Sequence, residues 1–149
     1  MAYTKDALWF YPVFNAQPAI GTIRCYGEEI VMHTGSEHLT QIANLVNEQL
    51  SGDKRWDELN LSDQIYSQYQ TNERMMILEL TYAEPQRIHS PSPFFSDFNA
   101  LIIPLDGSYS DTNTLFNLVR GKPAGGSFHV TTFAPVIEYL EENNLCKLQ

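Results

Sequence analysis

Positive charge is scarce in this sequence. Its 149 residues carry 9 Lys and Arg against 18 Asp and Glu, which gives a formal net charge of −9 at pH 7. Nucleic acids and anionic membrane surfaces are bound by clustered basic side chains, and here only Lys54–Arg55 and the Arg120/Lys122 pair lie close together. The composition therefore disfavours both kinds of partner. The surplus of carboxylates favours solubility, or an encounter with a basic protein that is steered electrostatically.

Cysteine is equally sparse. Cys25 and Cys146 lie far apart, no CxxC pair occurs and no histidine stands at zinc-ligand spacing. These features argue against a disulfide-stapled secreted scaffold, so we expect Cys25 to be a thiol that packs as a small hydrophobe. The apolar run Ala7–Phe14 is interrupted by Pro12 and lacks a small-residue cleavage site, so it does not resemble a signal peptide. No segment reaches transmembrane length, and we expect a cytoplasmic protein.

Signatures of common catalytic sites are also missing. The sequence has no GxSxG elbow, no Walker loop, no HExxH pair and no dinucleotide-binding fingerprint. A small hydrolase often shows its nucleophile or its metal ligands through such local spacing. Their absence favours a binding protein over an enzyme and predicts neither a metal nor a cofactor.

The chain does contain enough apolar surface for a core. Hydrophobic residues make up 43% of it, with eight Phe, eight Tyr and two Trp. A chain of this length and composition can fold without disulfides or a structural metal. We expect a single domain over residues 1–149, with no internal repeat and no linker.

Alternation of apolar and polar residues predicts a β-hairpin over residues 20–33. The Gly27-Glu28 pair suits a type II′ turn, which sets Cys25 opposite Ile30 and Ile23 opposite Met32. These four apolar side chains then share one face. The other face carries Arg24, Tyr26, Glu29, Val31 and His33.

Further patterns predict the remaining elements. Ser36 and Ser62 are placed to cap helices, and Pro135 fits the first turn of a last helix. Another helix is expected between a cap at Asp111 or Thr112 and a stop at Gly121. Strands are expected at Met75–Tyr82, Ala100–Leu105 and Phe128–Phe133. Pro104 indicates that the second of these is an edge strand or that it ends there. Between the first two strands, regular structure is interrupted by Pro85, Pro91 and Pro93. This mixture predicts an α+β fold, with an antiparallel or mixed sheet of about five to six strands and three to four helices packed on it.

Two His-x-Thr triplets occur, His38-Leu39-Thr40 and His129-Val130-Thr131. They resemble the signature of the 2H phosphoesterases. The resemblance implies that the two histidines exchange protons while Thr40 and Thr131 hold a phosphate. The second triplet fits a strand whose alternation turns His129 and Thr131 to one side. The first lies in the opening turn of a helix, where His38 and Thr40 point in different directions, so a surface helix residue and a strand histidine are the competing interpretation.

A glycine-rich run beside the second triplet is a candidate anion site. Backbone amides of Gly125 and Gly126 could form a nest, with Arg120 and Lys122 supplying positive charge. The alternative is a helix C-cap at Gly121 followed by a plain loop.

Two other segments suit a protein partner. Phe94 and Phe95 stand on a proline-stiffened stretch, where aromatic side chains could anchor a partner or fold back onto the core. Acidic residues surround Trp56, and they could form a docking face for a basic protein or a solvated loop. These acids are Asp53, Asp57, Glu58 and Asp63.

The sequence therefore favours a small acidic domain that binds, and neutralises or regulates, a protein partner. A basic partner fits the charge, as with intracellular immunity proteins or inhibitors. The alternative function is a small phosphoesterase or anion-binding enzyme centred on His129.

Overall fold

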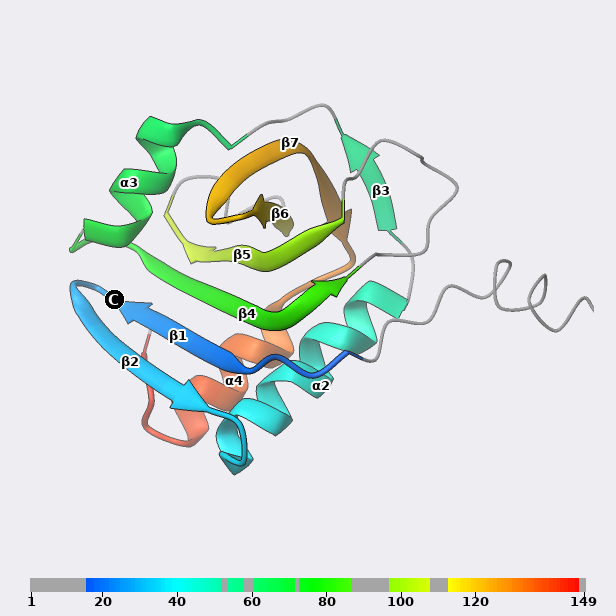
Figure 1. Cartoon of the computed structure of the whole chain (residues 1–149). Helices are drawn as coiled ribbons and strands as arrows, with labels where there is room; N and C mark the ends of the chain where they lie inside the picture. The colour runs from blue at the N-terminus through cyan, green and yellow to red at the C-terminus, as the bar shows by residue number, and fades with distance from the viewer. Residues whose placement is uncertain are drawn as a thin grey trace, which may run out of the picture.

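The structure is a computed structural model that describes residues 16–51, 54–57, 61–71, 73–86, 97–107 and 113–147. These residues form one seven-stranded antiparallel sheet and three helices (Figure 1). The strands are β1 (Ile20–Cys25), β2 (Glu28–His33), β3 (Lys54–Asp57), β4 (Met76–Gln86), β5 (Phe98–Asp106), β6 (Thr114–Val119) and β7 (Lys122–Val130). The helices are α2 (Glu37–Ser51), α3 (Asp63–Thr71) and α4 (Ala134–Glu142). The expected α+β class is confirmed.

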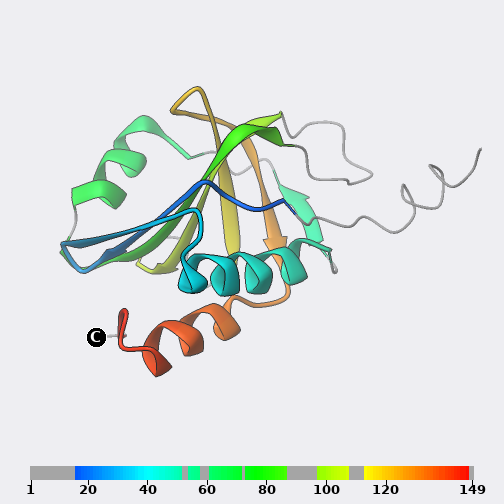
Figure 2. The same ribbon diagram turned by 60° about the horizontal axis from the view of Figure 1, so that its bottom comes forward.

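The strand order across the sheet is β2-β1-β4-β5-β6-β7-β3, so β2 and β3 form its two edges. In the sequence, helix α2 connects one edge strand, β2, to the other, β3. The sheet is strongly curved, with β5, β6 and β7 curling over one another in Figure 1. Figure 2 shows α2 and α4 together under one face of the sheet, with α3 on the other side.

Each face of the sheet has its own hydrophobic core. The larger core lies between the sheet and helices α2 and α4, and it includes Ile42, Leu78, Leu101, Phe128 and Leu140, each 0% exposed. The smaller core lies under α3. It consists of Leu61, Tyr69, Met75, Ile77, Ala100, Ile102, Phe116 and Leu118, with Ile65 and Tyr66 packed against it.

The helix starts follow the predicted capping chemistry. The Ser36 hydroxyl accepts a hydrogen bond from the Leu39 amide at 3.4 Å, and the Ser62 hydroxyl accepts one from the Ile65 amide at 3.1 Å. A serine oxygen thus satisfies one of the free amides at each helix start. Pro135 lies in the first turn of α4, as predicted.

The predicted hairpin is confirmed, but its turn lies one residue earlier. Cys25 pairs with Glu28, so the turn residues are Tyr26 and Gly27, with φ of 49° and 97°. Two positive φ values give a type I′ turn, whose twist matches that of the flanking strands. Ile23 consequently pairs with Ile30 rather than with Met32. Because the pairing shifts by two positions, the four predicted apolar side chains still face the larger core.

Residues 114–119 form strand β6, so the helix predicted there is wrong. Leu115 packs in the larger core and Phe116 in the smaller one. A strand buried on both faces shows no polar alternation, which makes it resemble a helix in sequence. Arg120 and Gly121, with φ of 54° and 80°, form the turn into β7.

Two proline predictions also need correction. Pro85 lies within β4, which continues to Gln86. Pro104 lies in β5, a central strand, so the edge position is wrong, whereas the alternative of a strand end fits its place two residues before Asp106. Its position coincides with a register shift against β4 and falls beyond the residues of β5 that pair with β6, so a residue without an N–H group is tolerated there.

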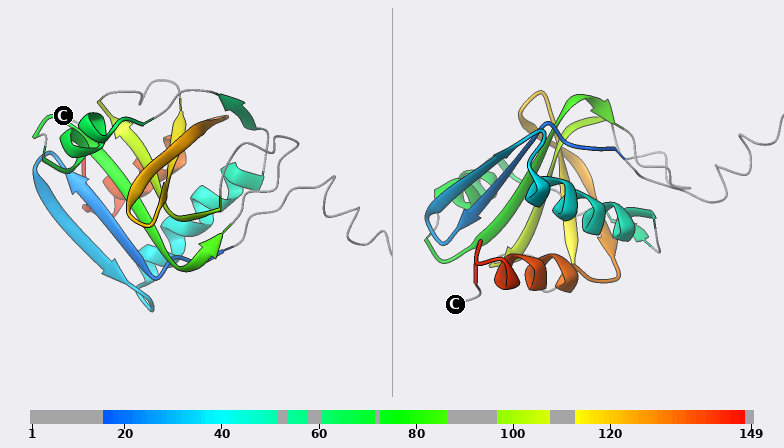
Figure 3. Two further views of the ribbon diagram at one scale, coloured as in Figure 1. Left: turned by 45° about the horizontal axis from the view of Figure 1, so that its top comes forward. Right: turned by 90° about the horizontal axis from the view of Figure 1, so that it is seen from below.

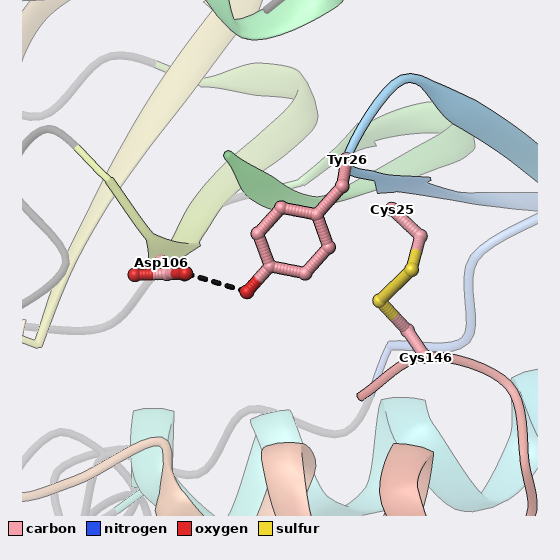
Figure 4. The surroundings of a disulfide bond; sticks show 4 residues. All are labelled: Cys25, Tyr26, Asp106 and Cys146. Atoms are coloured by element: carbon pink, nitrogen blue, oxygen red, sulfur yellow. Dashed lines mark hydrogen bonds between the residues drawn. A yellow bond between two sulfur atoms is a disulfide. The ribbon is translucent and has the colours of Figure 1, made fainter. Parts of the chain in front are cut away.

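The two cysteines form a disulfide, contrary to the expected free thiol at Cys25. The chain after α4 returns to the end of β1 and brings the Cα atoms of Cys25 and Cys146 to 5.9 Å, across a sequence separation of 121. Figure 4 shows this bond beside Tyr26, whose hydroxyl donates a hydrogen bond to Asp106 at 2.5 Å. The disulfide and this hydrogen bond fix the same end of the sheet.

Candidate functional site

The structure does not bring the two predicted histidines together. The Nδ1 atom of His38 lies 2.8 Å from the Tyr139 hydroxyl, between α2 and α4. The Nδ1 atom of His129 lies 2.8 Å from the hydroxyl of Thr114 on β6. Because Phe128 and Val130 face the larger core, His129 between them points to the opposite face of the sheet. The two imidazoles are thus separated by the sheet.

The predicted phosphate-holding threonines are also placed elsewhere. The Thr40 hydroxyl donates to the Ser36 carbonyl at 3.1 Å, within its own helix. Strand β7 ends at Val130, so Thr131 does not continue the alternation that would align it with His129. No joint site of these residues is formed.

The glycine-rich run is not the loop expected from the sequence. Lys122, Gly125 and Gly126 belong to strand β7, which pairs with β6 on one side and β3 on the other. Gly125 and Gly126 lie at the register shift of β7 against β6, between the pairs Leu118/Pro123 and Phe116/Ser127, and Arg120 is a turn residue at the β6–β7 corner. Anion binding by this run stays a prediction.

The predicted partner-binding residues are only partly described. Asp53, Glu58, Phe94 and Phe95 lie outside the described residues. Trp56 and Asp57 belong to β3, the edge strand beside β7, and Asp63 is the exposed first residue of α3. A docking role for this group stays a prediction.

A different surface stands out on the side of the sheet opposite α2 and α4. Helix α3 covers the part of this side that belongs to β4, β5 and β6. The part formed by β1 and β2 lies beyond it (Figure 3). We call this part the open face; its exposed residues are Ile20 of β1 and Glu29, Val31 and His33 of β2. Thr22, Arg24 and Glu79 lie on the same side at its border and are largely buried.

The open face carries the exposed large hydrophobic side chains of the described chain. Ile20 is 37% exposed and Val31 is 44% exposed. Val31 pairs with Thr22, and Ile20 pairs with His33, so the two apolar side chains are diagonal neighbours. Together they form a small apolar patch among polar neighbours on this face.

A charged network borders these side chains. Arg24 contacts Glu29 at 2.7 Å and Glu79 at 3.5 Å, with the Arg24 side chain only 17% exposed and that of Glu29 56% exposed. The Tyr66 hydroxyl of α3 donates to the other oxygen of Glu79 at 2.9 Å. Burial, and then this hydrogen bond, raise the pKa of Tyr66 to about 12. The network therefore keeps a protonated phenol and a net negative charge at the border of the open face.

Sequence reasoning placed Arg24, Glu29, Val31 and His33 on one face of the hairpin but did not identify that face as a site. The alternation was visible, whereas the extent of α3 coverage depends on tertiary packing. The signal that could have found the site is Val31, an apolar residue between Glu29 and His33 on the outward side of its strand.

Other kinds of site find no support in the described chain. Among the described residues, no group of three or more His, Cys, Asp or Glu side chains could hold a metal ion. No helix within the described ranges is long and apolar enough to cross a membrane. No protein-family model matches this chain, and no curated protein or solved structure is significantly similar to it.

Proposed function

We propose that this chain is a protein-binding domain whose partner docks on the open face. The observation that carries the proposal is the pairing of two exposed apolar side chains, Ile20 and Val31, on a part of the sheet that no described helix covers. Apolar side chains at the centre of a patch, with polar groups around them, are typical of protein interfaces.

The charge of the chain favours a basic partner. The net charge is −9, and Arg24 at the border of the open face is shared by two carboxylates. A negative surface steers a basic protein toward it. The role we propose is that of a domain which neutralises or regulates this partner, in the manner of an immunity protein or inhibitor.

Phosphoesterase activity is the second candidate, and the separation of His38 and His129 weighs against it. Acid–base catalysis by two histidines needs both of them within hydrogen-bonding reach of one substrate. The cytoplasmic location expected from the sequence also stays a prediction, and the disulfide weighs against it, because such bonds persist mainly in oxidising compartments.

Affinity capture from the source cells, followed by partner identification, tests the proposed function. Wild-type chain and Ala134→Asp should retain the same basic protein, whereas Ile20→Asp and Val31→Asp should not. Ala134 is exposed on α4, so its substitution adds the same charge away from the open face. Retention should also weaken as salt is raised.

Equal retention by Val31→Asp and Ala134→Asp would refute the role of the open face. Failure of the wild-type chain to retain any protein would refute the proposed function itself. Hydrolysis of a cyclic phosphodiester by the wild-type chain, lost in His129→Ala, would favour the enzyme instead.

A further inference from the structure

In the described part of the chain, the outer edge of β2 has no strand partner, and the pairing with β1 determines which of its backbone groups point outward. Cys25 and Glu28 flank the two-residue turn and so form a hydrogen-bonded pair between β1 and β2. The Thr34 amide donates to the Ala19 carbonyl at 3.0 Å in the same phase, while the Ala19 amide donates to the Thr81 carbonyl of β4. Such pairs alternate along an antiparallel ladder. The N–H and C=O groups of Glu29, Val31 and His33 therefore point away from β1, toward the side where the sheet ends.

This edge has only part of the usual protection against strand pairing. Edge strands are normally blunted by short length, charged side chains, proline, a bulge or an inward-pointing charge, and β2 has six residues with charges at Glu28 and Glu29. Strand β2 contains no proline, pairs with β1 without a register shift and turns Ile30 and Met32 toward the core. Its central outward residue is Val31, 44% exposed.

The edge is complementary to itself in one register. If two copies of β2 pair antiparallel about Val31, the outward groups of each strand meet the outward groups of the other. Val31 then faces Val31 of the second copy, and Glu29 faces His33 at both ends. A carboxylate facing an imidazole is a favourable cross-strand pair, and two β-branched valines pack well at the centre of the strand pairing. The Ser36 amide donates to the His33 carbonyl, so His33 would contribute mainly its own N–H to the pairing.

We propose that the occupant of the β2 edge is a second copy of this chain, paired strand to strand in the Val31-centred register. The two sheets then continue into one another, and the two open faces lie side by side as one twofold-symmetric surface. This pairing does not depend on the proposed function, since it requires only purified chain and the backbone edge.

Disulfide trapping tests the register directly. Purified Val31→Cys should form a cross-linked dimer under mild oxidation, because residue 31 faces its own copy. Glu29→Cys alone and His33→Cys alone should remain uncross-linked, because each lies about 13 Å from its own copy in this register. A mixture of Glu29→Cys and His33→Cys should cross-link. Cross-linking of Glu29→Cys alone, or none with Val31→Cys, would overturn the proposal.

Charge exchange provides an independent test by analytical ultracentrifugation. Glu29→Lys should raise the dimer dissociation constant about tenfold, because both ends of the pairing lose the carboxylate that faces the polar His33 side chain. Adding His33→Glu to the Glu29→Lys variant should restore the wild-type dimer dissociation constant, because a lysine then faces a glutamate at both ends. Glu28→Lys is the matched control, since Glu28 is exposed on the same strand but projects from the other face. A wild-type chain that sediments as a monomer at every concentration, or a dimer that Glu29→Lys leaves unchanged, would overturn the proposal.

Discussion

Removal of the Cys25–Cys146 disulfide should lower the free energy of unfolding substantially. The bond joins residues separated by 121 positions, so it closes most of the unfolded chain into one covalent loop. In the chain-entropy treatment, a loop of this length corresponds to about 5 kcal/mol. Residual structure in the unfolded chain reduces such effects, and we therefore expect a loss of about 2–5 kcal/mol.

The perturbation is the double variant Cys25→Ala/Cys146→Ala, compared with wild type by urea unfolding. Fluorescence and circular dichroism should follow the same transition, which establishes two-state behaviour. The urea dependence of the unfolding free energy should also become steeper in the variant, because its unfolded state exposes more surface. Reduction of the wild type should reproduce the variant, and reductant should not alter the variant.

A loss below about 1 kcal/mol would refute this reasoning. It would mean that the contacts of α4 and the larger core, rather than the bond, hold the C-terminal segment on β1. Cys146 itself is only 4% exposed within that core, so part of the measured loss will come from packing. Hydrogen exchange in α4 separates the two contributions, because a packing defect loosens α4 locally, whereas an effect on the unfolded chain does not.

Three further predictions concern single residues. Asn117 is fully buried and neither polar atom of its side chain has a hydrogen-bond partner among the described residues, so Asn117→Leu should raise the free energy of unfolding by about 1–3 kcal/mol in urea titrations. Gly21→Ala should lower it by about 1–3 kcal/mol in the same assay, because the new Cβ would lie 2.5 Å from Leu39 Cδ1; an unchanged midpoint would show that Leu39 moves freely. The pKa of Tyr66 is raised from 10.0 to about 12, so folded stability should fall as pH rises across that interval, and Tyr66→Phe should reduce the fall in urea midpoints measured across it.

Local chemistry made much of the fold predictable. Ser36 and Ser62 marked helix starts, and the alternation along Met76, Leu78 and Leu80 marked a strand with one face on a core. Such signals need only neighbours in the chain. Strand β6 was missed because Leu115 and Phe116 are buried on opposite faces, which removes the alternation that distinguishes a half-exposed strand.

The sites depended on contacts that the sequence could not supply. Cys25 and Cys146 meet only because the chain after α4 returns to β1, and nothing in their spacing indicates it. The separation of His38 from His129 likewise follows from which face of the sheet each element occupies. The open face is recognisable only when the extent of α3 is known, although the polar alternation of β2 was already visible.

The strand order also has a consequence for the sequence of assembly during synthesis. Pairings of β1 with β2, β4 with β5, β5 with β6 and β6 with β7 join consecutive strands and can form as soon as each hairpin leaves the ribosome. Strand β3 instead waits for β7, since Lys54 pairs with Val130, 76 positions later (130 − 54). Until then the segment after α2 has no sheet to join, and closing so long a loop is slow. Strand β3 is therefore the last strand that can join the sheet, since its partner β7 is the last strand of the sheet to be synthesised.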